Sequence, residues 1–315
     1  MRDDESVPPT PRRPALFAAA TLTVMCLGAA GCGSGTDTAQ ARPGPDSGTA
    51  APSASAPASS ADPASPSPVR GSSASPKRPG SPSASAPDTS SGPLAGKTVV
   101  IDPGHNPSNH LHTAEIARQV DIGTTHKECD TTGTSTNAGY AEAEFTLDVS
   151  HRMRTLLRAQ GAKVVLTHDN DRPFGPCVDE RARIGNKAKA DAVVSVHADG
   201  SAVGNRGFHV ILPASVRGGG ADTSKIVDPS RDLGTRIAGL FVRTTGSAPS
   251  NYIGGNTGLD TRKDLGGLNL STVPKVFIEC GNMRDPKDAA LLTSAGWRQK
   301  AAQGIADGIS SYLNG

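Results

Sequence analysis

Residues 97–105 read KTVVIDPGH, and this stretch decides the fold. Lys97–Asp102 is a short, β-branched run closed by Pro103 and Gly104, a pattern that predicts a β-strand entering a turn. The centre of the run is continuously apolar instead of alternating with polar residues. Such a strand is typical of a parallel sheet that is covered on both faces.

Further apolar runs and helical patterns alternate after this strand. The expected strands are residues 163–167, 192–197, 207–212 and 275–279, and the expected helices are residues 142–160, 178–188, 230–244 and 297–313. This alternation predicts a single α/β domain with a mostly parallel, twisted sheet and helices on both faces.

The amino-terminal part of the chain has a different composition. Up to about residue 91 it is dominated by Ser, Pro, Ala and Gly. A segment so poor in large apolar side chains cannot offset the entropy lost on ordering. We therefore expect residues 33–93 to be a disordered linker and residues 94–315 to be the folded domain.

Residues 1–32 are typical of an export signal. Arg12 and Arg13 precede an apolar run, residues 15–30, which is short for a membrane span and long enough for a signal peptide. The run ends in Ala-Ala-Gly before Cys32, a sequence that resembles a bacterial lipobox. Lipidation of Cys32 would hold the protein at the outer face of the cytoplasmic membrane, with no other membrane attachment. Cleavage after a small residue, followed by free secretion, is the alternative.

Charge and composition argue against a nucleic-acid partner. The net charge is +2 at pH 7, the basic residues are dispersed, and aromatic residues make up 3% of the chain. Neither a basic stripe nor a platform of aromatic side chains for stacking bases is expected.

Three predicted strands lead into residues capable of chemistry, namely His105, His197 and Glu279. Ligands of open α/β sheets bind at the carboxyl ends of the strands. Two histidines and a carboxylate, such as Glu142 at the start of a helix, can bind zinc and leave one position for water. A further glutamate could then accept a proton from that water.

Each of these residues also has an ordinary structural interpretation. A single histidine is more often a hydrogen-bonded residue than a ligand, and an acidic residue favours a helix N-terminus in any protein. Glu279 is harder to explain structurally, because a buried, unpaired carboxylate is costly.

The order of motifs across Gly96–Leu313 resembles the N-acetylmuramoyl-L-alanine amidases of the zinc-dependent amidase 3 type. The resemblance extends in particular to the single-domain mycobacterial peptidoglycan amidases. The motifs are GKTVVIDPGHNP at Gly96, EAEFTL at Glu142, CVDERARIGN at Cys177, DAVVSVHADG at Asp191, RGFHV at Arg206 and DLGGLNLSTVPKVFIECGNM at Asp264.

The resemblance implies a role for each of the four residues. His105, Glu142 and His197 would be the zinc ligands, and Glu279 would be the catalytic glutamate. Glu144 is the alternative to Glu142, and the register against Thr146 and Leu147 favours Glu142.

The resemblance also implies substrate contacts and a disulfide. Arg262 and Asp264 resemble residues that line the cleft, where Arg262 could bind the carboxylates of the stem peptide. A loop-bracing ion pair between the two is the alternative. Cys129 and Cys177 would form the disulfide, and Cys280 would be a small core residue.

The expected function is hydrolysis of peptidoglycan. The bond cleaved would be the amide between the lactyl group of N-acetylmuramic acid and the L-alanine of the stem peptide. We expect a monomer, without an occluding helix in residues 213–229. The alternatives are a zinc peptidase acting within the stem peptide, a catalytically inactive cell-wall-binding lipoprotein and a purely structural surface lipoprotein.

Overall fold

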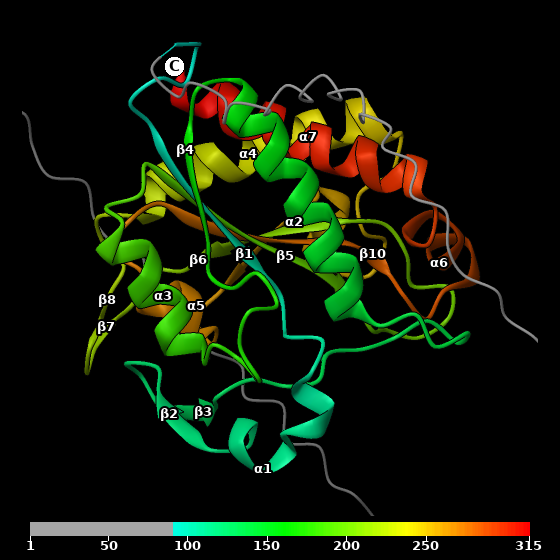
Figure 1. The fold of residues 1–315 in the computed structure, drawn as a ribbon, viewed down its shortest axis with the longest axis horizontal. Helices are drawn as coiled ribbons and strands as arrows, with labels where there is room; N and C mark the ends of the chain where they lie inside the picture. The colour runs from blue at the N-terminus through cyan, green and yellow to red at the C-terminus, as the bar shows by residue number, and fades with distance from the viewer. Residues whose placement is uncertain (1–90) are drawn as a thin grey trace, which may run out of the picture. The chain divides into compact units, whose positions relative to one another are not determined.

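Six strands form the central sheet of residues 91–315, which are the residues that the computed structural model describes (Figure 1). In spatial order they are β4 (Lys163–Leu166), β1 (Thr98–Pro103), β5 (Ala192–Asp199), β10 (Lys275–Asn282), β6 (His209–Pro213) and β9 (Leu259–Arg262). The export signal, Cys32 and all but the last three residues of the linker 33–93 lie outside the described residues.

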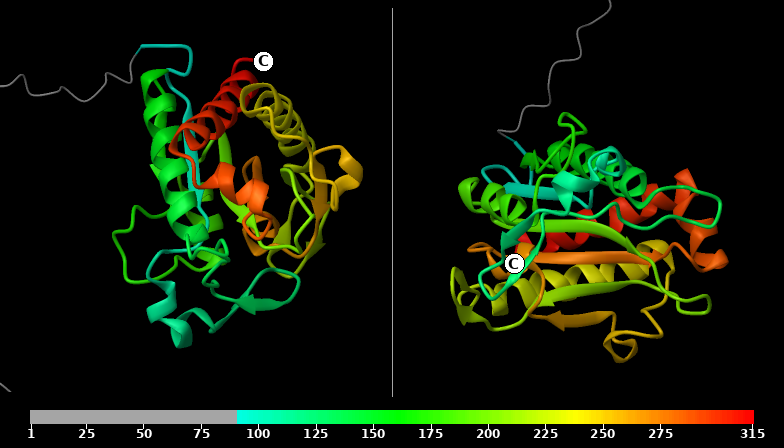
Figure 2. Two further views of the ribbon diagram at one scale, coloured as in Figure 1. Left: turned by 90° about the vertical axis from the view of Figure 1, so that its right-hand side faces the viewer. Right: turned by 90° about the horizontal axis from the view of Figure 1, so that it is seen from below.

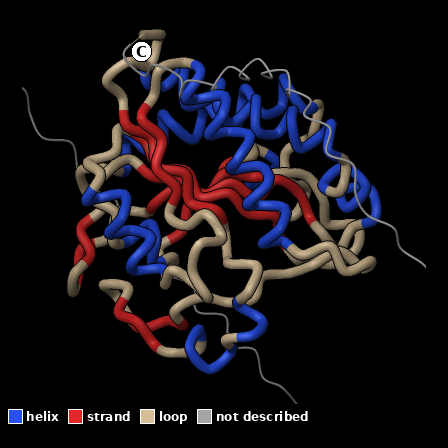
Figure 3. The backbone as a smooth tube through the Cα atoms, in the orientation of Figure 1, coloured by secondary structure: helices blue, strands red, loops and turns tan. Residues whose placement is uncertain are grey.

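Helices surround the sheet (Figure 3). The longer ones are α2 (Glu142–Ala159), α3 (Val178–Lys187), α4 (Val227–Thr245), α6 (Pro286–Leu292) and α7 (Ala295–Leu313). The shorter elements are α1 (Thr113–Ile116), α5 (Gly266–Asn269), the hairpins β2 (Gln119–Asp121) with β3 (His126–Glu128) and β7 (Arg217–Gly218) with β8 (Ala221–Asp222), and 3-10 turns at Asn109–Leu111 and Gly254–Asn256.

The sheet is mostly parallel, as the sequence predicted. β4, β1, β5 and β10 run parallel to one another, whereas β6 is antiparallel to β10 and parallel to β9. β9 and α6 were not expected. β9 reads Leu-Asp-Thr-Arg and has no apolar run, so its sequence carries no strand signal. α4 begins at Val227, three residues earlier than expected, and holds Pro229 in its first turn, where a proline is tolerated.

Alternate residues of each strand face two different layers. One face carries residues such as Ile101 and Val194, which form the main core with α2, α4 and α7. The opposite face carries Val100 and Val193, which pack near Ile184 of α3. Helices therefore cover both faces, and the predicted fold class is confirmed.

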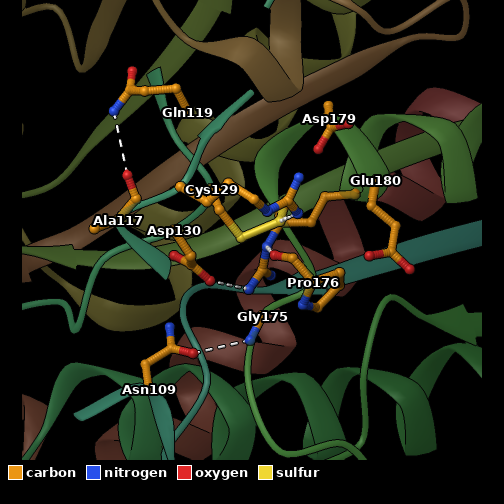
Figure 4. The surroundings of a disulfide bond; sticks show 12 residues. Asn109, Ala117, Gln119, Cys129, Asp130, Gly175, Pro176, Asp179 and Glu180 are labelled. Carbon is orange, nitrogen blue, oxygen red and sulfur yellow. Dashed lines mark hydrogen bonds and ion pairs between the residues drawn. A yellow bond between two sulfur atoms is a disulfide. The ribbon is translucent and has the colours of Figure 1, made fainter. Parts of the chain in front are cut away.

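A segment between β1 and α2 projects beyond the carboxyl end of β1 and contains α1 and the β2–β3 hairpin (Figure 2). A disulfide joins Cys129 in this segment to Cys177, the residue that precedes α3 (Figure 4). This is the pair that the family resemblance implied. Among residues 91–315, none of the helices combines the length and apolar character that crossing a membrane requires.

Candidate active site

Three residues from distant parts of the chain converge at the carboxyl end of the sheet. His105, Glu142 and His197 each offer one ligand atom, and these atoms lie within 4.8 Å of one another. Glu142 lies between the two rings, with Oε2 3.2 Å from Nε2 of His105 and Oε1 2.9 Å from Nδ1 of His197. Such a group could hold a metal ion through three protein ligands.

Local structure explains how these side chains meet. His105 follows β1 with a φ of 60°, a left-handed conformation that is uncommon outside glycine. The preceding residue must be small, because a Cβ on Gly104 would lie 2.4 Å from Cε1 of His197. The Thr146 hydroxyl donates to the carbonyl of Gly104 over 2.7 Å and so ties the turn to α2.

Glu142 is the first residue of α2, and its surroundings there differ from those of Glu144. Its carboxylate also accepts the amide of Thr134 over 2.9 Å, and the side chain is buried. Glu144 is exposed to solvent and takes no part in the converging group.

Charges at this site favour a cation. Burial disfavours a charged ring, but Glu142 and Asp130 raise the pKa of His105 well above its ordinary value. Burial also opposes the charge of Glu142, yet the two histidines hold its pKa well below the ordinary value. The attraction that increases the proton affinity of His105 would act equally on a metal ion. Two imidazoles and a carboxylate are ligands that suit zinc.

Glu279 lies on β10, directly across from His197 on β5. Its side chain is partly buried, and its Oε2 is buried without a hydrogen-bond partner among the described residues. Burial is the largest cause of a pKa raised well above the ordinary value, and the negative charges of Glu142 and Asp199 add to it. A raised pKa favours the protonated form of this carboxyl group, as suits a residue that gives and takes a proton.

Two adjoining cavities meet at the converging residues. A cavity of about 500 Å³ has apolar walls that include Val178, Leu265 and Phe277, with Asp264 also in its lining. A second cavity of about 400 Å³ has a more polar lining that includes Glu142, Glu279 and Arg262. The residues common to both are His105, Thr131, His197, Leu265 and Phe277.

Arg262 and Asp264 form the ion pair that was the alternative to substrate binding. Arg262 donates through Nε and Nη2 to the two carboxylate oxygens of Asp264, over 2.9 and 2.7 Å. Lys127 also contacts Asp264, at 3.3 Å. Since both residues of the pair also line the cleft, bracing and substrate contact are compatible.

Sequence reasoning missed a group of buried charges beside the site. Asp102, Asp130, Arg181 and Lys275 are all buried. Burial opposes the charge of Asp102, but Lys275 and Arg181 hold its pKa well below the ordinary value. The sequence did contain two signals of these buried charges. One is a lysine at the start of an apolar strand, and the other is an arginine within the CVDERARIGN motif; both positions favour burial.

Comparison with known proteins agrees with this geometry. The family model described as N-acetylmuramoyl-L-alanine amidase matches residues 99–311, well over half of the chain. The N-acetylmuramoyl-L-alanine amidase Rv3717 of Mycobacterium tuberculosis is 42% identical over 225 residues, which cover 70% of this chain and 88% of that protein.

Two further relatives extend the comparison. The crystal structure of the N-acetylmuramyl-L-alanine amidase Ami1 from Mycobacterium smegmatis superposes with a TM-score of 0.64 at 40% identity, covering 71% of this chain and 99% of that one. The amidase LytC of Bacillus subtilis is 26% identical over 226 residues, 70% of this chain and 36% of LytC. With the matched family model and these identities, the chain belongs to the N-acetylmuramoyl-L-alanine amidase family.

Proposed function

We propose that the protein is a zinc-dependent N-acetylmuramoyl-L-alanine amidase of the cell envelope. It hydrolyses the amide between the lactyl group of N-acetylmuramic acid and the L-alanine of the peptidoglycan stem peptide. One observation carries this proposal. A histidine–glutamate–histidine group that suits a metal lies beside Glu279, which has one carboxyl oxygen buried without a partner among residues 91–315.

In this proposal His105, His197 and Glu142 would hold the metal. Zinc, when bound, supplies Lewis acidity, which lowers the pKa of water and polarises a carbonyl group. The protein's own contribution is to fix the three ligands in the turn after β1, at the start of α2 and on β5, so that little reorganisation is needed when substrate binds.

Glu279 moves the proton. Its carboxylate would accept a proton from the attacking water and then deliver it to the departing nitrogen of L-alanine. Burial and the neighbouring negative charges raise its pKa, so the protonated form needed for the second step is accessible.

The cleft binds the two sides of the scissile amide. The larger, mostly apolar cavity and the smaller, more polar one both reach the metal ligands, so a substrate extending in two directions fits. We assign Arg262 and Asp264 to substrate binding at the wall of this cleft. The Arg262 guanidinium would face carboxylates of the stem peptide while Asp264 holds it in place.

The remaining features of the proposal concern the whole chain. Residues 1–32 act as an export signal, residues 33–93 as a linker and residues 94–315 as the catalytic domain. The mature protein is a monomer, anchored through a lipid on Cys32 or freely secreted. Mass measurement of the mature amino terminus, with Cys32→Ala as the comparison, separates these two forms.

The decisive experiment is mass spectrometry of muropeptides digested with and without a chelator. We expect products with a new L-alanine amino terminus and no other, and we expect chelation to abolish them. A zinc peptidase would expose amino termini within the stem peptide, and an inactive wall-binding or structural protein would release nothing.

A matched variant tests the role of Glu279. Glu279→Gln is expected to keep its zinc and to lose at least about 100-fold in turnover, as is typical when a general acid–base group is removed. Zinc content and the initial rate on purified sacculi are measured on the same preparation. Near wild-type hydrolysis by this variant would assign the proton transfer to another group.

A further inference from the structure

Arg181 on α3 is buried, and all five of its N–H groups are used. Nε donates to the carbonyl of Pro176 over 2.8 Å. Nη1 donates to Oδ1 of Asp102 and to the carbonyl of Pro103, over 2.8 and 2.6 Å. Nη2 donates to the carbonyl of His105 and to Oδ2 of Asp130, over 3.0 and 2.8 Å. A planar guanidinium with five donors can make this set of bonds, and an ammonium group cannot.

Two of these bonds reach the first proposed metal ligand. Arg181 holds the carbonyl of His105, the residue with the left-handed backbone. It also holds Asp130, whose other oxygen, Oδ1, lies 3.2 Å from Nδ1 of His105. The carbonyl of Thr131 lies 3.1 Å from the same nitrogen. The two acceptors at Nδ1 favour a proton on that nitrogen, which leaves Nε2, 3.2 Å from Oε2 of Glu142, on the side of the proposed metal.

Arg181 also belongs to a larger group of buried charges that includes Asp102 and Lys275. Asp102 accepts from Arg181 through Oδ1, and its Oδ2 accepts from Nζ of Lys275 over 3.1 Å and from the hydroxyl of Ser195 over 2.6 Å. Two cations and two carboxylates therefore neutralise one another inside the protein. A buried group of this kind persists only when each charge is paired, so its members are fixed in place.

The disulfide joins the segment that contains Asp130 to the segment that leads into α3. Cys129 immediately precedes Asp130, and Cys177 immediately precedes α3, four residues before Arg181. Figure 4 shows Asp130 next to Cys129, close to Gly175 and Pro176 of the loop that leads into α3. The covalent bond and the ion pair thus hold Asp130 from both sides.

We propose that Arg181 is a positioning residue of the metal centre, acting through Asp130 and through the backbone of His105. It holds the turn after β1 in its unusual conformation and directs Nε2 of His105 towards Glu142 and His197. Outer partners of metal-bound histidines typically contribute about 10- to 100-fold to metal affinity. This inference rests on the proposed zinc site and adds a residue that controls it.

The test compares zinc binding by the full chain in four forms, using zinc alone and a competing chelator. Arg181→Lys and Asp130→Asn each remove the bridge while leaving side chains of similar size, and we expect each to weaken zinc binding by about 10- to 100-fold. Arg183→Lys is the matched control on the same helix, because Arg183 is exposed and its ion pair is with Asp179 of that helix, away from His105 and Asp130. It should bind zinc like the wild type.

A second measurement separates positioning from folding. Nitrogen-15 NMR of the histidine rings reports, in the zinc-loaded protein, which ring nitrogen of His105 binds the metal and which carries the proton. We expect the wild type to bind zinc through Nε2 with the proton on Nδ1, and both variants to show a mixture of the two arrangements. We also expect the double variant to bind zinc no more weakly than the weaker single variant, because both changes break one linkage.

Unchanged zinc affinity and an unchanged His105 tautomer in Asp130→Asn would overturn the inference, even if Arg181→Lys fails to fold. His105→Ala shows which proposal has failed. If the wild type binds zinc through His105 and the bridge variants bind equally well, only the positioning role falls. If the wild type binds no zinc, the proposed function falls and this inference falls with it.

Discussion

Glu142 is the residue on which the three-ligand arrangement depends, because it contacts both histidines through different oxygens. We expect Glu142→Gln to lose zinc and activity, since an amide cannot supply the negative charge that offsets a divalent ion. Glu144→Gln, two residues away and exposed, is the matched control and should change neither. Zinc content after dialysis and muropeptide hydrolysis check both variants. Full metal content in Glu142→Gln would remove it from the ligand set.

The pH dependence of zinc binding follows from His105. Despite its burial, Glu142 and Asp130 raise the pKa of this ring above its ordinary value, about 6.5. Because zinc requires the deprotonated ring, protons compete with the metal at and below the raised pKa. Zinc affinity should therefore begin to fall above pH 6.5 and decline further with acidification. Chelator competition from pH 9 to pH 6 measures this, and a flat profile would contradict it.

At the residue scale, sequence was informative for some positions and silent for others. His105, His197 and Glu279 follow or end apolar strands, where a polar residue already stands out. Asp130 has no such signal, because its importance comes from contacts with Arg181 and His105, which lie 51 and 25 residues away in the chain. Pairings of that kind depend on the folded backbone, and a single sequence does not reveal them.

At the scale of the elements, the disulfide cross-links the segment that connects β1 to α2. The disulfide closes a loop of 48 residues, and loss of such a cross-link is expected to cost about 4 kcal/mol of unfolding free energy. We expect this loss in Cys129→Ala/Cys177→Ala, because the unfolded chain regains the freedom that the cross-link removed. Urea denaturation of the oxidised wild type and of the variant measures it.

The wild type under reducing conditions is the control for this variant. It should denature at the same urea concentration as the double alanine protein, since both lack the bond. Equal midpoints for the oxidised wild type and the variant would show that the segment is held by other contacts alone.

Long elements were predictable, and short ones were not. α2, α7 and β5 carry enough apolar residues to show their period. β9 and the two strands of the β2–β3 hairpin are each three or four residues long and largely polar, so their conformation follows from pairing with neighbours. The antiparallel direction of β6 could not be predicted either, because an apolar run carries no information about direction.

For the whole molecule, the boundary of the folded part can be tested by truncation. The Leu94 side chain is fully buried in the main core, and its amide donates to the carbonyl of Gln160 over 2.8 Å. We expect residues 91–315 to fold and to hydrolyse soluble muropeptides at the rate of the full chain. A chain starting at residue 97 loses Leu94 and should be less stable by about 2–5 kcal/mol. Thermal denaturation and activity distinguish the two, and equal stability would move the boundary.

The two cavities that meet at His105 and His197 also define what a tight synthetic inhibitor would look like. A central hydroxamate could chelate the metal. A hydrophobic arm would occupy the space beside Val178 and Phe277, and an arm bearing a carboxylate would extend towards Arg262 on the other side. A compound with only one arm would leave half of the cleft filled with water and would gain correspondingly less affinity.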